Sequence, residues 1–305
     1  MADDPHRSGD PIADLRAAHA RDYAQGGEFE VAADLMRQAL ERAPDWTAGR
    51  MQLADFLLQA ERDTEARTIF QGILDADPAD PYGAELKLAS LGALPVPAAP
   101  SPLFVAGLFD QYAPRFEEAL VNRLGYRVPD LLLGAIDRLA GTDRRFARTL
   151  DLGCGTGLMG ERLRERTDWL EGVDLSPGML ERARRKGLYD ALREGDILEP
   201  FAAEPFDLVT AADVLTYLGD LEPAFRRIAE TARPGAPVAF SFEVEETAEP
   251  FTLRASLRYA HRPDHVRSLL VACGFETVAI ERAVIRRDAG ADVAGAIVTA
   301  RRAGR

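Results

Sequence analysis

A glycine-rich turn between an apolar segment and an amphipathic one is the feature that most constrains this fold. The apolar segment 148–152 runs into Gly153, Gly155 and Gly157, and apolar residues at helical spacing follow. Glycines let backbone N–H groups approach a ligand closely, and the N-terminus of the next helix favours an electron-rich group. The stretch therefore predicts a strand, a ligand-binding turn and a helix, as in an α/β sheet.

The same alternation continues along the C-terminal two thirds of the chain. Short β-branched or apolar runs predict strands at 148–152, 170–175, 190–196, 206–213 and 236–243. Helical spacing between or before them predicts helices at 108–120, 126–140, 157–166, 177–186 and 220–232. After a helix at 265–275, two strand-like runs flank the turn 288–290 and predict an antiparallel hairpin. We expect an α/β fold with a Rossmann-like, mostly parallel sheet of seven strands that ends in this hairpin.

The N-terminal part has a different pattern, with helical spacing throughout and no strand-like run. Shifting it by 34 positions aligns Ala32 with Ala66 and Met36 with Phe70, and also superposes two prolines. This pattern resembles tetratricopeptide repeats, in which small residues allow two helices to approach closely. We predict a disordered tail at 1–11, an all-α repeat arm at 12–91, a Pro-rich linker at 92–102 and the α/β domain at 103–305.

The glycine turn alone leaves several ligands open. No Lys-Ser/Thr pair follows the glycines, so a Walker phosphate loop is excluded. A nicotinamide cofactor remains open, because Asp174 ends the next strand where a ribose-binding acid belongs. Two details disfavour it. The glycines alternate as G-x-G-x-G, and Asp151 precedes them, where its charge would repel a pyrophosphate but suit a cationic ligand.

At this point the chain resembles the class I S-adenosylmethionine-dependent methyltransferases. Their first motif matches LDLGCGTG at 150–157, the second matches GVDLSPGML at 172–180, and the third matches REGDIL at 193–198. The segment FDLVTAADVLTYL at 206–218 matches the strand and loop that border the substrate in that family. The resemblance covers roughly residues 104–302. With the arm included, the chain resembles the predicted methyltransferases that carry tetratricopeptide repeats.

The resemblance implies S-adenosyl-L-methionine as the cofactor and assigns its contacts. Asp151 and the loop Gly153, Cys154, Gly155 and Gly157 would receive the amino-acid end of the cofactor. Asp174, with Leu175 beside it, would bind the ribose hydroxyls, and Ala211 would lie near the methionine portion. Met179, Asp196 and Ile197 would contact the adenine. The segment 108–120 would form a lid over the cofactor, with Tyr112 and Phe116 as its contacts.

The acceptor side is less defined. The segment after the fourth strand lacks the Asn/Asp-Pro-Pro-aromatic signature of amide methylation, and no Pro-Cys pair is present. Acceptor-side candidates are Asp213, Tyr217, Tyr259 and His261, the last two in the insert 256–265. His261 and His265 have the spacing of metal ligands, but Pro263 between them predicts a helix start, so no metal site is expected. Cys154 is expected to be a packed thiol rather than a nucleophile.

Composition narrows the partners. The net charge of -13 disfavours nucleic-acid binding, which needs clustered Lys and Arg. No stretch approaches 18 apolar residues, and two cysteines with an acidic N-terminal start favour a reducing, cytoplasmic location without membrane contact. We expect a methyltransferase for a small-molecule acceptor. A protein methyltransferase that recruits its target through the arm, a non-catalytic interaction scaffold and a nicotinamide oxidoreductase remain alternatives.

Overall fold

The computed structural model divides the chain into two compact units, Met1–Pro97 and Ala98–Arg305. It describes residues 7–118, 120, 124–200, 204–288 and 290–304. Residues 1–6 of the expected N-terminal tail therefore lie outside the described part, whereas Asp10 accepts hydrogen bonds from the N–H groups of Ile12 and Ala13 at the start of the first helix. No helix of the described chain is both long and apolar enough to cross a membrane.

The first unit consists of helices, each of which packs against the next in the chain. They are α1 (Pro11–Gln25), α2 (Phe29–Leu40), α3 (Thr47–Gln59), α4 (Asp63–Ala76) and α5 (Ala84–Ser90). Ala32 and Ala66, which the 34-residue shift superposes, are both fully buried, as are Met36 and Phe70. Gly49 of α3 packs beneath the indole of Trp46, where a Cβ would collide with the ring. Small residues thus allow the close helix packing that the repeat pattern predicts.

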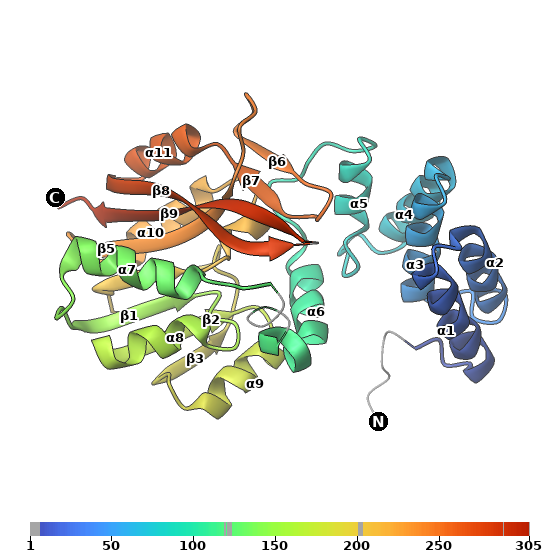
Figure 1. Ribbon diagram of the computed structural model, residues 1–305, viewed down its shortest axis with the longest axis horizontal. Coiled ribbons are helices and arrows are strands. Elements are labelled where there is room, and N and C mark those ends of the chain that lie inside the picture. The colour runs from blue at the N-terminus through green and yellow to red at the C-terminus, as the bar shows by residue number, and fades with distance from the viewer. Residues whose placement is uncertain (1–6, 119, 121–123, 201–203, 289, 305) are drawn as a thin grey trace. The chain divides into compact units, whose positions relative to one another are not determined.

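The second unit is a mostly parallel sheet with helices on both faces (Figure 1). Its strands are β1 (Phe146–Leu152), β2 (Thr167–Asp174), β3 (Ala191–Glu194), β4 (Leu208–Ala211), β5 (Pro237–Val244), β6 (Phe251–Leu253), β7 (Tyr259–His261), β8 (Phe275–Asp288) and β9 (Ala291–Arg302). The helices are α6 (Pro102–Tyr112), α7 (Val128–Ala140), α8 (Leu158–Leu163), α9 (Pro177–Lys186), α10 (Glu222–Thr231) and α11 (Pro263–Ala272). Short 3-10 turns in the described chain include η1 (Ala113–Arg115), η3 (Arg164–Arg166) and η4 (Leu215–Tyr217).

Seven strands of this sheet run in the order β3-β2-β1-β4-β5-β9-β8, with β8 and β9 antiparallel. The Rossmann-like fold class is confirmed, and the strand count needs a correction, because β6 and β7 add a small antiparallel pair. Glu243 of β5 is paired with Gly295 of β9 and with Ala260 of β7. The extra pair therefore adjoins the C-terminal end of β5 on its β4 side. Strands of three residues are too short for the alternation by which strands are recognised in a sequence.

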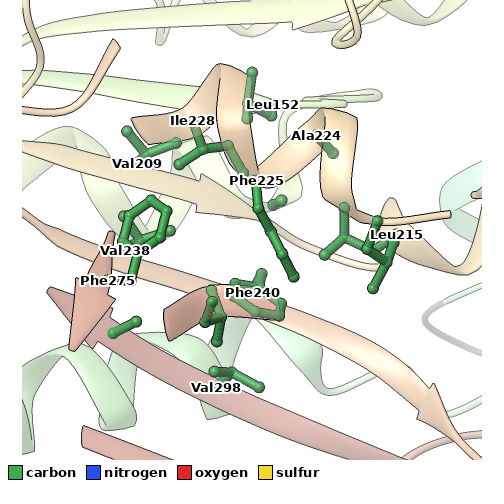
Figure 2. Close-up of a cluster of buried hydrophobic side chains, with 14 of the residues drawn as sticks. Leu152, Val209, Leu215, Ala224, Phe225, Ile228, Val238, Phe240, Phe275 and Val298 are labelled. Carbon is green, nitrogen blue, oxygen red and sulfur yellow. The ribbon is translucent and has the colours of Figure 1, made fainter. Parts of the chain in front are cut away.

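Alternating side chains of the central strands bury the two faces of the sheet. Val209, Val238 and Phe240 pack with Phe225 and Ile228 of α10 (Figure 2). Their sequence neighbours Leu208 and Ala239 belong to a second cluster that contains residues of α7 and α8. Because helices cover both faces of the sheet, the sequences of these strands are continuously apolar rather than alternating.

The segment 108–120, expected to be one helix, is interrupted. Helix α6 ends at Tyr112, and the 3-10 turn η1 contains Pro114. Proline has no N–H to continue the helical ladder and its ring clashes with the preceding turn, so the helix stops there. Residue 119 lies outside the described part of the chain.

Candidate functional site

A cavity of about 700 Å³ opens at the C-terminal ends of the parallel strands of the second unit. β1 pairs with β2 on one side and β4 on the other, so the strand order reverses at β1. Crevices at such a switch point are the usual ligand sites of open α/β sheets. The cavity wall includes the following predicted site residues: Tyr112, Gly153, Cys154, Gly155, Asp174, Leu175, Met179, Asp196, Ile197, Asp213 and Tyr217, together with the lid residue Phe116. Asp151, Gly157, Ala211, Tyr259 and His261 lie outside the wall.

The glycine turn adopts backbone angles that favour glycine. Gly153, Gly155 and Gly157 have φ of +59°, +53° and +91°. A Cβ on Gly153 would collide with Val214 after β4, whereas the space beside Gly155 is open, with no atom within 4 Å of a Cβ position. An open position at the cavity wall leaves the backbone of Gly155 accessible to a ligand.

Asp174, at the end of β2, is held against this turn by backbone donors. Its carboxylate accepts N–H bonds from Gly155 at 2.8 Å and from Ser176 at 2.9 Å. Its side chain is almost buried, and burial raises the pKa of the carboxyl above its ordinary value, although the two N–H donors oppose this shift. A carboxylate has about four lone-pair sites, so this one can still accept from a hydroxyl group in the cavity.

Asp151 does not reach the cavity wall. Its carboxylate accepts hydrogen bonds from the hydroxyls of Tyr189 at 2.7 Å and Thr210 at 2.8 Å. The side chain is 1% exposed, and burial raises the pKa of this carboxyl to about 6. The expected direct contact with the cofactor is corrected accordingly, because both oxygens face protein hydroxyls behind the turn. Ala211 is likewise buried in β4, and its neighbour Ala212 lines the cavity instead.

Tyr189 is a supporting residue that the sequence analysis missed. Its ring fills the space beneath the turn, where a Cβ on Gly160 would collide with it and a Cβ on Gly157 would lie 3.1 Å from it. It also donates to Asp151, so one side chain supports the glycines and satisfies the buried carboxylate. A lone tyrosine between a helix and a strand carries no signal for this role in the sequence.

The lid helix α6 is tied to the start of α9 through Asp110. The carboxylate of Asp110 accepts from the hydroxyl of Ser176 at 2.5 Å and from the N–H of Gly178 at 2.8 Å. Ser176 is also the N-cap of α9, where its hydroxyl accepts from the N–H of Met179 at 3.0 Å. The tie fixes the lid beside Asp174 and Met179, and the negative charge suits the positive end of the helix dipole.

Opposite the glycine turn, Asp213 belongs to a buried ionic network. It follows β4 in a left-handed conformation, with φ of +60°, and its N–H donates to the hydroxyl of Ser241. Both of its carboxylate oxygens accept from Nη1 of Arg286 at 2.9 Å, and Arg286 also pairs with Glu243. Arg286 is 1% exposed. Breaking such a buried pair leaves an uncompensated charge, so the network fixes Asp213 at the cavity wall.

Tyr217 and Arg258 complete this side of the cavity. The Tyr217 ring contacts Phe109 of the lid edge-on, with centroids 5.2 Å apart. Arg258 donates from Nε to the Tyr217 hydroxyl at 3.3 Å, and its guanidinium lies 5.9 Å from the centre of that ring. Arg258, in the turn between β6 and β7, is another wall residue that the sequence analysis did not single out.

The expectation for Tyr259 and His261 is wrong. Both side chains are fully buried in β7, where they pack against the ring of Phe251. Burial lowers the pKa of His261 to about 4, so the ring is neutral near pH 7. The insert does border the cavity, but through Ser256, Leu257 and Arg258. Among the described residues, no group of three or more His, Cys, Asp or Glu side chains is placed to hold a metal.

Cys154 lies in the wall as a protected thiol. It is 6% exposed, and burial raises the pKa of its thiol well above the ordinary value. A thiol that stays protonated is a poor nucleophile. The expectation of a packed rather than reactive cysteine agrees with this environment.

Comparison with known proteins finds a match in both parts of the chain. Residues 150–240 match the family model described as a methyltransferase domain, and residues 23–89 match a tetratricopeptide repeat. Each match lies within one of the two units of the chain. A malonyl-acyl-carrier-protein O-methyltransferase of Enterobacter lignolyticus is 33% identical over 138 residues, which cover 45% of this chain and 52% of that protein. A ubiquinone biosynthesis O-methyltransferase of Hahella chejuensis is 31% identical over 122 residues, covering 38% of this chain and 50% of that protein.

The chain therefore spans about half the length of these two relatives. Among solved structures, the cyclase SpnF has a TM-score of 0.56 at 20% identity, covering 68% of this chain and 98% of that one. An S-adenosylmethionine-dependent methyltransferase from Clostridium acetobutylicum has a TM-score of 0.50 at 16% identity, covering 65% and 100%. These two likenesses concern the fold alone.

Proposed function

We propose that this chain is an S-adenosylmethionine-dependent methyltransferase for a small-molecule acceptor bound in the cavity of its second unit. The observation that carries the proposal is the pairing of Gly155 with Asp174. An accessible glycine backbone lies hydrogen-bonded to a buried carboxylate at the switch point of the sheet. The two relatives are O-methyltransferases, and this supports the same reaction.

The residues of the cavity fit this cofactor. Asp174 offers free lone pairs to ribose hydroxyls, and the loop 153–156 offers backbone groups to the amino-acid end. Met179 and Ile197 offer apolar surface to the adenine, with Asp196 beside them at the wall. The cofactor supplies a methyl group already activated by its sulfonium.

The protein's own part is to position the acceptor and to exclude water. The lid contributes Val105, Leu108 and Phe109 to the wall, and Asp110 holds that lid in place. Holding two reactants in a near-attack geometry is worth several kcal/mol of barrier. The volume of about 700 Å³ lies within the usual range for sites of small molecules and cofactors, which favours a small acceptor over a folded protein.

The repeat arm supports a second role. Tetratricopeptide repeats commonly present a surface to a partner, so we propose that the arm binds a protein and leaves the chemistry to the second unit. Cys154 and Cys273 are free in the structure, in keeping with a proposed reducing, cytoplasmic location.

Calorimetry with S-adenosylhomocysteine and with NAD⁺ tests the cofactor. We expect binding of the first and none of the second, and the opposite result overturns the proposal in favour of an oxidoreductase. Turnover of S-adenosylmethionine against a metabolite pool and against a protein pool then tests the acceptor. Binding without turnover in either pool indicates a scaffold, and turnover with proteins alone indicates a protein methyltransferase.

A further inference from the structure

Arg258 is the one positively charged side chain among the described residues that line the cavity. It lies at the end of the turn between β6 and β7, where its carbonyl accepts from the N–H of Arg254 and Leu257 has φ of +59°. The turn thus brings a cation to a wall made largely of apolar side chains. In a low-polarity site a charge interacts more strongly than in water, so this guanidinium bears directly on what the cavity can bind.

The contacts of Arg258 leave its guanidinium with donors to spare. Nε donates to Tyr217 at 3.3 Å, and Nη1 forms an ion pair of 3.8 Å with Asp288, whose side chain is half exposed. A guanidinium has five N–H donors. The buried Arg286 differs, because Asp213 and Glu243 both pair with it. Arg258 is therefore the arginine that is able to receive an anion from the cavity, and its planar fork matches a carboxylate.

The acidic and phenolic groups of the wall are poorly suited to take a proton from an acceptor. Four aspartates of the described chain line the cavity. Asp213 is bound by Arg286 through both oxygens, and Asp174 is bound by two backbone N–H groups. Asp288 pairs with Arg258, and Asp196 accepts from the N–H of Leu198. Burial raises the pKa values of the Tyr126 and Tyr217 phenols, so both stay protonated near pH 7. The wall includes no histidine among the described residues.

These observations select the chemistry of the acceptor. A hydroxyl, phenol or thiol needs a base to become a strong nucleophile near neutral pH, and an ammonium needs to lose a proton. A carboxylic acid is already ionised there. It also carries the charge that Arg258 attracts. The apolar wall formed by Phe104, Leu108 and Phe109 suits a hydrocarbon or aryl body.

We propose that the acceptor is a carboxylic acid with an apolar body, that Arg258 binds its carboxylate, and that the product is the methyl ester. This inference rests on the proposed function. One carboxylate oxygen forms the new bond to the methyl carbon while the carbon–sulfur bond of the sulfonium breaks. The electron pair of that bond stays on sulfur, which becomes the neutral thioether, and no proton is moved.

Binding of defined probes tests the role of Arg258 without depending on turnover. Octanoate and 4-phenylbutanoate are titrated by calorimetry into the full chain saturated with S-adenosylhomocysteine, and octan-1-ol and 4-phenylbutan-1-ol serve as neutral counterparts. We expect at least one acid to bind at least about tenfold tighter than its alcohol, as for a charge-assisted hydrogen-bonded pair. Arg258→Met removes this preference while the affinity for the alcohols stays within about threefold.

Two further variants keep the test decisive. Arg282→Met removes an exposed arginine of β8 that pairs with Glu246 outside the cavity, and it behaves as the wild type. Arg258→Lys keeps the charge but loses the fork, so the preference falls at least about threefold. If Arg258→Met does not bind S-adenosylhomocysteine, the acid preference of Arg258→Lys tests the role of Arg258 instead, and an unchanged preference in that variant overturns the inference.

The outcomes separate the two proposals. A wild type that binds S-adenosylhomocysteine but prefers neither acid overturns the carboxylate inference, as does a preference that survives Arg258→Met. A wild type that does not bind S-adenosylhomocysteine overturns the proposed function itself. With S-adenosylmethionine added, an alkali-labile methyl ester of a probe acid supports the inference, and a methyl ether formed from a probe alcohol instead contradicts it.

Discussion

Asp110→Ala is expected to release the lid helix α6 from the cofactor side of the cavity. Asp110 accepts two hydrogen bonds from the start of α9, from Ser176 at 2.5 Å and from Gly178 at 2.8 Å. Hydrogen bonds to a charged acceptor contribute about 1.5–3 kcal/mol each. The bond to Gly178 is solvent-exposed, so we reduce the joint contribution to about 2 kcal/mol. The docking equilibrium of the lid should then fall roughly thirtyfold.

Amide hydrogen exchange of α6 measures this change directly. When the lid opens and closes faster than its amides exchange, protection factors report the fraction of molecules with the lid open. Protection of the amides of 105–112 should then fall by up to roughly thirtyfold, while α7 and the central strands keep their protection. Affinity for S-adenosylhomocysteine should weaken as well, because part of the binding energy is then used to dock the lid. The loss need not be complete, since Lys186 of α9 also pairs with Glu117 just after the lid turn at 2.6 Å.

Two controls distinguish loss of the Asp110 hydrogen bonds from a general loss of stability. Gln111→Ala changes the exposed neighbour of Asp110 and should leave exchange of α6 unaltered. A double-mutant cycle with Ser176→Ala removes the hydroxyl partner, which is also the N-cap of α9. The effects of the two substitutions on lid protection should be less than additive. Full additivity, or unchanged protection in Asp110→Ala, refutes the reasoning.

Three more predictions address the cofactor site, its buried carboxylate and the arm. Asp174→Ala should weaken S-adenosylhomocysteine binding by about 1–3 kcal/mol through loss of a charged hydrogen-bond partner, and unchanged affinity in calorimetry would reject the ribose assignment. Burial raises the pKa of Asp151 to about 6 from 3.8, so the stability that its protonated form contributes is full below pH 3.8 and is lost as the pH rises from 3.8 to 6. Between pH 4 and 6 the wild type should therefore lose about 2 kcal/mol of unfolding free energy relative to Asp151→Asn in urea titrations, and parallel pH profiles would contradict that pKa. A fragment starting at Ala98 should keep its affinity for S-adenosylhomocysteine, because the described cavity wall lies within the second unit, and a folded fragment that does not bind would mean that the arm completes the site.

The parts of the site that were predictable are those whose chemistry is local in the sequence. Three glycines with positive φ, an acid at the end of the next strand and Met179 in the helix after it follow from one strand-turn-helix unit and its neighbour. The turn geometry needs glycine whatever surrounds it, so a short motif suffices. The family resemblance then assigned a role to each position.

The residues that escaped prediction act across long separations in the sequence. Tyr189 bonds Asp151 from 38 positions away, Asp110 bonds Gly178 from 68, and Arg286 bonds Asp213 from 73. Each is one charged or aromatic residue in an ordinary helix, strand or loop. Their partners are fixed only when the sheet order and the docking of the lid are known, and neither is encoded in local spacing.

The error at Tyr259 and His261 shows how a correct segment can yield the wrong side chains. Successive residues of a strand point to opposite faces, so a prediction that places this insert at the cavity without recognising the strand β7 in it cannot tell which of its side chains face the cavity. Here Tyr259 and His261 share the face that packs on Phe251, and Arg258 at the end of the preceding turn lines the cavity. The residue that faces the cavity, Arg258, directly precedes Tyr259, and it implies a different acceptor chemistry. A neutral, buried imidazole would have suggested a general base and a hydroxyl acceptor, whereas a guanidinium at the wall selects an acceptor that is already an anion.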